Sequence, residues 1–110
     1  MIVERQPRPD WSAVPRPGVV GVQARVLLHR EGLLVVQLHF APEATIDPHG
    51  APHEIDVLCV SGSGRVSVGE EESTLQAGQR VVWPAAVEHC LWTEEFELEV
   101  IVVERVGRRA

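Results

Sequence analysis

Residues 78–93 read GQRVVWPAAVEHCLWT, and this stretch says more about the fold than any other part of the chain. The run RVVW at 80–83 is apolar and β-branched, which favours a strand. Pro84 ends that run, because proline has no N–H to give to a sheet ladder. A second short strand, CLW, follows at 90–92. The segment therefore predicts two short strands joined by a connection that carries His89.

The same alternation of short apolar runs and turn signals extends along most of the chain. Further strands are predicted at residues 22–28, 33–40, 57–60, 65–68, 73–76 and 96–104. Turns are predicted at 30–32, 61–64, 69–72 and 77–78, where Gly, Ser and Glu gather. No segment combines a helix cap with a 3.6-residue period. Many short strands with evenly spaced turns indicate an all-β sandwich or barrel, and a closed barrel removes exposed edges.

Length and composition indicate one small domain with a real core. The chain has 110 residues, of which 45% are hydrophobic. We expect a proline-rich N-terminal arm over residues 1–18, because Pro7, Pro9, Pro15 and Pro17 exclude a central strand there. The arm should lie on the barrel or on a partner subunit. The barrel should then cover residues 19–106, and residues 107–110 should form a basic tail.

Charge and hydropathy argue against several classes of partner. The formal net charge of −6 does not suit nucleic acid, whose phosphates require a positive face. No run of about 18 apolar residues is present to span a membrane, and the first residues lack the apolar stretch of a signal peptide. We therefore expect a cytoplasmic protein, in which Cys59 and Cys90 are free buried thiols rather than a disulfide.

The histidine-bearing segments resemble the two conserved motifs of the cupin superfamily. The second motif places Gly, Pro, Gly, His and Asn at fixed intervals, and here Gly78, Pro84 and His89 fall in register while Ala86 and Thr93 take the other two places. The first motif covers residues 43–62, EATIDPHGAPHEIDVLCVSG, where His49 and Gly62 fall in register. Glu43, Ala51 and Ile55 stand at that motif's first Gly, second His and Glu places. The resemblance spans about half of the chain and implies an antiparallel jelly-roll barrel, also called a double-stranded β-helix.

The resemblance implies a metal held by histidines, with two of the usual four ligands missing at their usual places. His53 lies two residues beyond the empty second-histidine place, and side chains two apart on a strand share one face. We therefore predict a three-histidine centre formed by His49, His53 and His89. Glu54 would point to the opposite face and could join only through a bulge. Such a centre suits a divalent transition metal (Fe, Mn, Zn or Ni) and would favour an anionic or chelating substrate.

Other residues are candidates for contacts with a substrate. Gln37 and His39 alternate with apolar neighbours on one strand, so they share a face that is either the pocket or solvent. Trp83 precedes Pro84 and would shape the pocket rim or pack in the core. Glu54 and His39 are the candidate catalytic bases, although neither is in register with the ligands.

Two functions from different classes follow from these observations. The first is a metal-dependent enzyme acting on a small molecule, with a dioxygenase favoured because a three-histidine ferrous centre suits oxygen activation. The second is a non-catalytic ligand- or metal-binding sensor module, and a purely structural barrel is a third reading. The resemblance also implies a homodimer, built through the N-terminal arm and the apolar strand at 22–28.

Overall fold

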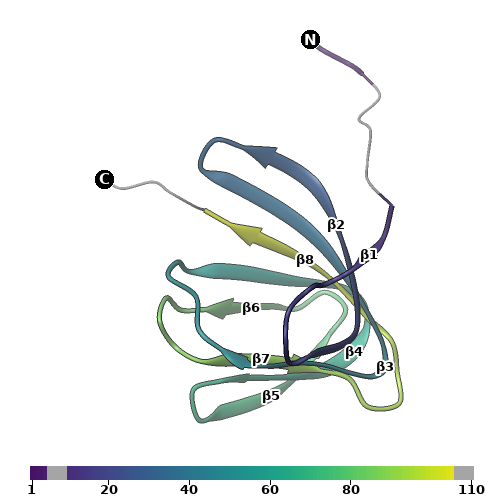
Figure 1. Cartoon of the computed structure of the whole chain (residues 1–110), viewed down its shortest axis with the longest axis vertical. Helices are drawn as coiled ribbons and strands as arrows, with labels where there is room; N and C mark the ends of the chain where they lie inside the picture. The colour runs from purple at the N-terminus through teal and green to yellow at the C-terminus, as the bar shows by residue number, and fades with distance from the viewer. Residues whose placement is uncertain (5–9, 106–110) are drawn as a thin grey trace.

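The computed structural model describes residues 1–4 and 10–105, and those residues form a closed antiparallel β-barrel without a helix (Figure 1). Its strands are β1 (Ser12–Ala13), β2 (Val19–Arg30), β3 (Leu33–His49), β4 (Ile55–Val68), β5 (Glu71–Gln76), β6 (Arg80–Trp83), β7 (His89–Trp92) and β8 (Leu98–Glu104). The predicted fold class is confirmed. The tail predicted at residues 107–110 and residues 5–9 of the arm lie outside the described part.

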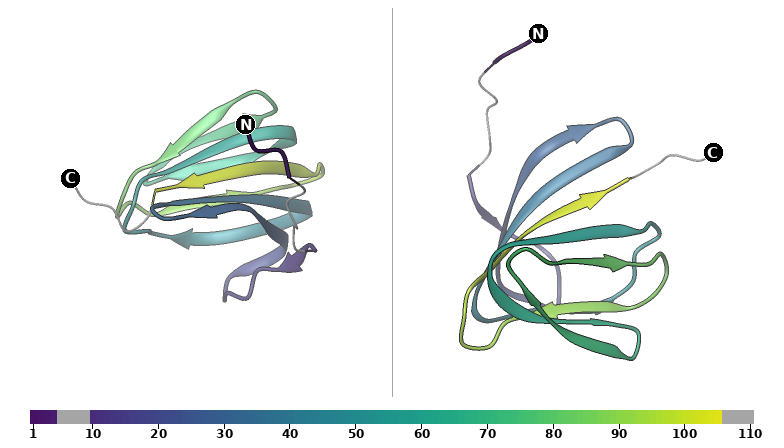
Figure 2. Two further views of the ribbon diagram at one scale, coloured as in Figure 1. Left: turned by 90° about the horizontal axis from the view of Figure 1, so that it is seen from above. Right: turned by 180° about the vertical axis from the view of Figure 1, so that it is seen from behind.

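The barrel closes because two long strands each belong to both of its sheets. β3 pairs with β8 from Leu34 to Phe40 and then with β7 from Thr45 to His49. β4 likewise pairs with β8 over residues 55–62 and with β7 over residues 65–68. The ring β3–β8–β4–β7 therefore returns to its start, while β2, β5 and β6 extend the two sheets (Figure 2).

The corner of β4 corrects one prediction from the sequence. Residues 61–64 were expected to form a turn, but β4 runs through them without a break. The register shifts between Cys59 and Ser61, and Gly62 has φ 80°, so this stretch is a bulge that carries the strand from one sheet to the other. A Cβ at Gly62 would lie 2.0 Å from the carbonyl oxygen of Glu97, so only glycine fits.

The corner of β3 extends the predicted strand in the same way. We expected it to end at Phe40, but it continues to His49. Residues 41–44 fall between the two pairing partners, so Pro42 disrupts no ladder with β7 or β8. Glu43, at the place of the first motif's glycine, takes a left-handed φ of 59°.

The core fills the space between the two sheets. Its side chains come from every strand of the closed ring, and the largest that are fully excluded from solvent include Phe40, Leu75, Leu91 and Leu98. Cys59 and Cys90 are buried free thiols, as expected. At one end of this core, the apolar packing gives way to Trp83 and His89, which are buried with it. That end carries the candidate site.

Candidate functional site

The site is centred on two histidines that face each other across neighbouring strands. His49 ends β3 and His89 begins β7, and the two are direct partners in the β3–β7 register. Their Nε2 atoms lie 3.2 Å apart, and the two rings meet edge to face with centroids separated by 4.4 Å. The prediction that imidazoles from two separate sequence segments converge is therefore confirmed for this pair.

The hydrogen bonding of His49 determines which of its nitrogens is free. Its Nδ1 lies 2.9 Å from the carbonyl oxygen of Asp47, which can only accept a hydrogen bond. Nδ1 therefore carries the proton, and in the neutral ring Nε2 presents a lone pair toward His89. A backbone carbonyl that fixes the tautomer of an imidazole in this way is typical of metal-ligating histidines.

His89 is enclosed almost completely. Only 1% of its surface is exposed, and the indole of Trp83 stacks on its ring with centroids 3.9 Å apart and planes 8° from parallel. Nδ1 of His89 and Nε1 of Trp83 are both buried without a hydrogen-bond partner in the described part of the chain. An unsatisfied buried polar atom costs about 1–3 kcal/mol. Two such atoms on stacked rings require an explanation other than packing alone.

Burial keeps His89 neutral. Loss of solvation, followed by the charge of His49, lowers the pKa of His89 from 6.5 to about 4, while the Val87 backbone acts in the opposite direction. Arg16 adds a smaller lowering of the same pKa. A histidine must be neutral to bind a metal, so this environment keeps His89 ready for coordination at neutral pH.

The spacing and chemistry of the pair suit a transition metal. Two nitrogen ligands at 2.0–2.1 Å from a tetrahedral ion lie about 3.3 Å apart. The two Nε2 atoms are 3.2 Å apart, so they match two positions of such a site. The structure brings only these two ligands together, because within residues 1–4 and 10–105 no group of three or more His, Cys, Asp or Glu residues is arranged to hold an ion.

His53, the third predicted ligand, does not lie on the strand that carries His49. β3 ends at His49, Gly50 and Pro52 follow outside any strand, and His53 falls on a bend before β4. The rule that side chains two apart share a face therefore does not apply there. His53 instead borders a hollow of about 380 Å³ that is lined by Pro52, His53, Glu54, Asp56, Ala85, Val103 and Arg105. Glu54 borders the same hollow, and within the described part of the chain it forms no ion pair with either imidazole.

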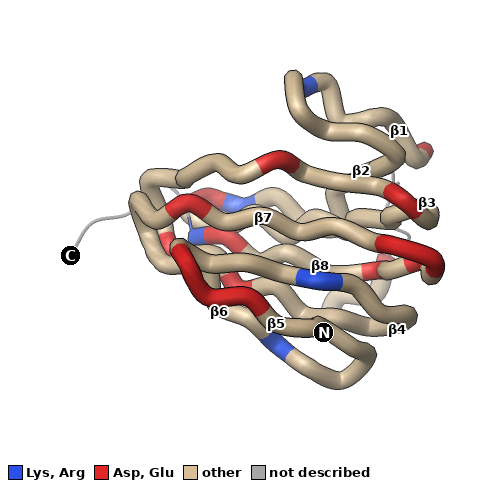
Figure 3. The backbone as a smooth tube through the Cα atoms, turned by 90° about the horizontal axis from the view of Figure 1, so that it is seen from below, with Lys and Arg blue, Asp and Glu red and all other residues tan. Residues whose placement is uncertain are grey.

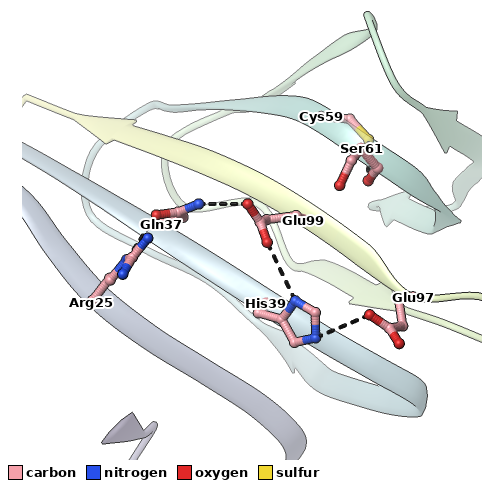
Figure 4. Close-up of polar contacts among 7 residues, drawn as sticks. All are labelled: Arg25, Gln37, His39, Cys59, Ser61, Glu97 and Glu99. Atoms are coloured by element: carbon pink, nitrogen blue, oxygen red, sulfur yellow. Dashed lines mark hydrogen bonds and ion pairs between the residues drawn. The ribbon is translucent and has the colours of Figure 1, made fainter. Parts of the chain in front are cut away.

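Gln37 and His39 lie on the outer face of the barrel, because Leu38 and Phe40 alternate with them and point into the core. Figure 4 shows them in a polar chain that runs across β2, β3 and β8. Arg25 donates to the Gln37 side chain, which donates to Glu99, and His39 lies 3.4 Å from both Glu97 and Glu99. Neither Gln37 nor His39 lines the barrel interior.

Arg16 is a residue near the pair that sequence reasoning missed. It lies in the loop between β1 and β2, close enough to His89 for its charge to affect that pKa. The one signal in the sequence is its position between Pro15 and Pro17, which restrict the backbone on both sides. The sequence predicts this segment only as an arm that lies on the barrel or on a partner subunit.

A hollow larger than the one beside His53 lies elsewhere. It measures about 780 Å³ and opens beside the β3 corner, lined by Pro42, Glu43, Ala44, Thr45, Trp92, Thr93, Glu94 and Glu95. Neither His49 nor His89 lines it, and it is wide open to solvent. Size alone therefore does not identify the site, and the facing imidazoles do.

The closed antiparallel barrel, with two histidines on facing strands, defines a class of small jelly-roll β-barrel proteins. Comparison with known families places the chain within it: residues 36–104 match the model of the cupin domain, and the chain belongs to the cupin family. No curated protein matches the chain. Within the described residues, no helix is long and apolar enough to cross a membrane.

Solved structures agree with this assignment. The polyketide cyclase RemF from Streptomyces resistomycificus superposes with a TM-score of 0.84 at 19% identity, covering 99% of this chain and 83% of its own. KdgF from Halomonas sp. gives 0.79 at 26% identity, with 91% and 90% covered. A cupin-2 domain from Rhodospirillum rubrum gives 0.82 at 17% identity, with 92% and 72% covered. These likenesses establish the fold.

Proposed function

We propose that this chain is a metal-dependent enzyme of the cupin type that acts on a small anionic or chelating molecule, with His49 and His89 as metal ligands. The observation that carries the proposal is the pair of facing Nε2 atoms, 3.2 Å apart on adjacent strands. Imidazole nitrogens suit zinc, iron, manganese or nickel. The hydrogen bond that orients His49, the neutral state of His89 and the stacking of Trp83 on His89 all favour coordination over simple packing.

His53 is proposed as the third ligand, brought in by a rearrangement of residues 50–54. That segment packs against the connection that precedes His89, since the Ala86 amide donates to the Ala51 carbonyl at 2.7 Å. His53 and Ala85 also border the same hollow. The three histidines thus belong to one end of the barrel, and His53 sits on a bend outside the strand ladders. A bend of this kind is easier to move than a paired strand.

Each residue at the site has a defined part in the proposed chemistry. A bound divalent metal would supply Lewis acidity and, if it is iron, an electron conduit for a dioxygenase. Asp47 orients His49 through its carbonyl, and Trp83 holds the plane of His89. His39 faces the outside of the barrel, so Glu54 is the remaining candidate for a proton-transferring group.

The alternative is a non-catalytic cupin that binds a metal or ligand as a sensor. Two observations favour it. Within residues 1–4 and 10–105 the ligand set has two histidines, and no carboxylate forms a hydrogen bond or ion pair with either ring. A site that lacks a positioned base binds more readily than it transforms.

Elemental analysis of protein purified without an affinity tag tests the proposal. We expect about one Fe, Mn, Zn or Ni per chain in the wild type and in His29→Ala, whose histidine is exposed on β2, but little in His49→Ala or His89→Ala. Consumption of oxygen with a chelating substrate would support the enzyme. Metal without turnover would support the sensor, and equal metal content in all four proteins would refute both.

We also propose that the chain is a cytoplasmic homodimer. β1 pairs with β2 at only two positions, so most of the outer edge of β2 has no strand partner among the described residues. Val20 and Val26 on that strand are 60% and 39% exposed. An open edge with apolar side chains is a ready pairing surface. Light scattering at micromolar concentration should report twice the 12.1 kDa chain mass, and a monomer would contradict the proposal.

A further inference from the structure

We propose that Arg16 is a specificity-determining residue that binds an anionic oxygen group, a carboxylate or a phosphate, of the molecule held at His49 and His89. This inference rests on the proposed function, because it names the chemistry of the ligand for the same site. It is carried by the way the chain holds the loop between β1 and β2 against the last part of β3 (Figure 1).

The chain is anchored immediately before Arg16. β1 pairs Ser12 with Ala24 and Ala13 with Gln23. Trp11 lies over the guanidinium of Arg25, with 4.4 Å between that carbon and the ring centroid, and meets the His39 ring edge to face at 6.0 Å. The polar chain of Figure 4 fixes Arg25 in turn through Gln37. The outer network therefore has a structural use, which is to hold the arm on the sheet.

The chain is anchored again immediately after Arg16. The Asp47 amide donates to the Gly18 carbonyl at 2.9 Å, and Val19 then pairs with Ile46. A Cβ at Gly18 would lie 2.9 Å from Oδ2 of Asp47, and Gly18 has φ 80°, so this approach requires glycine. Asp47 is also the residue whose carbonyl orients His49. The arm is thus joined to the same short segment that positions one of the two imidazoles.

The loop itself is preorganised. The Arg16 amide donates to the Val14 carbonyl at 2.9 Å, and the Arg16 carbonyl accepts from Val19 at 3.3 Å. Pro15 and Pro17 restrict the backbone on either side. A rigid backbone lowers the entropy lost when the side chain binds a ligand, which is the usual gain from preorganisation.

The charge of Arg16 is available to a ligand. Arg16 is exposed, and within residues 1–4 and 10–105 it forms no ion pair, although the Asp47 carboxylate lies against nearby Gly18. The hydrogen bond between the Asp47 amide and the Gly18 carbonyl, with the pairing of Val19 and Ile46, places the loop that carries Arg16 beside the last part of β3, which ends at His49. Acidic positions outnumber basic ones along the chain (Figure 3), so a free guanidinium beside the site is a local departure from the net charge of −6.

The chemistry of the side chain indicates what it would bind. A guanidinium presents a planar fork of donors that matches a carboxylate or a phosphate, and it is always charged. A molecule with one oxyanion at the imidazole pair and another at Arg16 would bridge the two. Neutral molecules would gain nothing from Arg16, so the residue would select for anions.

Isothermal titration of oxalate and of inorganic phosphate, each with metal-free and with zinc-loaded protein, tests the inference. We expect Arg16→Gln to weaken binding of at least one anion about tenfold, while Arg30→Gln, an exposed arginine at the far end of β2, leaves it unchanged. Loss for oxalate alone identifies a carboxylate ligand, and loss for phosphate alone identifies a phosphate. Equal affinity of Arg16→Gln and the wild type, or no binding of either anion by the wild type, overturns the inference.

A second variant separates the charge of Arg16 from its placement. Trp11→Ala keeps Arg16 but removes the packing that anchors the arm, so it should weaken the same anion without changing the zinc affinity. Zinc titration alone tests the proposed function: absence of zinc binding refutes the metal site, while the anion comparison in metal-free protein still decides the role of Arg16. An unchanged anion affinity in Trp11→Ala would contradict the argument from anchoring.

Discussion

Acid should destabilise this protein through His89, and the effect can be worked from the structure. The pKa of His89 falls from 6.5 to about 4 on folding, chiefly because the ring is buried and secondly because His49 is beside it. The unfolded chain therefore takes up a proton at His89 at a higher pH than the folded chain does. The stabilisation is fully present above pH 6.5 and is lost as the pH falls toward 4.

The size of this effect follows from the same two values. The pKa difference is about 2.5, and each pH unit corresponds to about 1.36 kcal/mol, so the full loss is roughly 3 kcal/mol. At pH 5 the proton linkage amounts to a loss of about 2 kcal/mol relative to pH 8. That is a large fraction of the stability expected for a domain of this size.

Urea unfolding in the presence of EDTA, at pH 8 and at pH 5, measures the loss. Carboxylates also titrate over this range, so the comparison is between proteins rather than between pH values. His89→Leu keeps an apolar surface against Trp83 and removes the titrating group, so it should lose about 2 kcal/mol less than the wild type between the two pH values. His29→Gln, which alters an exposed histidine, should lose as much as the wild type.

The reasoning fails if the wild type and His89→Leu lose equal stability between pH 8 and pH 5. That result would mean that His89 has the same pKa in the folded and unfolded chains, and hence that burial does not keep it neutral. NMR titration of the His89 ring protons would give the same answer site by site. A midpoint near 6.5 in the folded protein would contradict the prediction independently.

Three further predictions concern the backbone and the core. Gly62→Ala should lower the free energy of unfolding in urea by at least about 2 kcal/mol more than Gly78→Ala does. Both glycines have positive φ, but an added Cβ would meet the Glu97 carbonyl at Gly62 and nothing within 4 Å at Gly78. Equal losses in the two variants would contradict the bulge. Ala86→Gly should raise the melting temperature slightly, because Ala86 has a left-handed φ of 63°. Relief of about 1–2 kcal/mol of backbone strain exceeds the cost of the extra conformational entropy that glycine gives the unfolded chain. A clear fall in the melting temperature would refute this. Phe40→Ala should lower the free energy of unfolding by about 3–5 kcal/mol, since Phe40 is fully buried, and a loss below 1 kcal/mol would show that the core is not packed as described.

The spacing of the second motif was sufficient to predict the main features of β6 and β7. A predicted strand at 80–83 is the observed β6, and Pro84 ends it as expected. The predicted strand at 90–92 begins one residue earlier, at His89. Local propensity and proline chemistry act over these few residues, so the sequence alone contains the information.

The corners of the barrel could not be predicted from the same signals. Ser61, Gly62, Ser63 and Gly64 have the composition of a turn, yet they continue β4. Whether a glycine-rich segment reverses the chain or bends it depends on what approaches it, and here the approaching group is the Glu97 carbonyl from a distant part of the sequence. Such long-range contacts leave no local trace.

The candidate site likewise contains residues that local signals predict and residues that depend on distant contacts. The place of His89 in the site is predicted by the motif spacing, and its burial is predicted by the apolar residues around it. The inward or outward orientation of Gln37 and His39 was left open, because strand periodicity separates the two faces of a sheet without saying which one is inside. Arg16 was missed because its proximity to His89 depends on where the arm returns to β3 at Asp47.

The register shift in β3, which prevents side-chain direction from being predicted by counting residues along the strand, is also what brings the two imidazoles together. Between Ile46 and His49 the register with β7 shifts, so that residues three apart become successive partners of Leu91 and His89, which are two apart. Without that shift, His49 would fall one place out of step with Ile46, whose side chain is in the core, and would point away from His89. A bulge at this point turns a surface histidine into the partner of a buried one. The position of the site is therefore a property of the bulge, and of the loop and arm that meet it at Asp47.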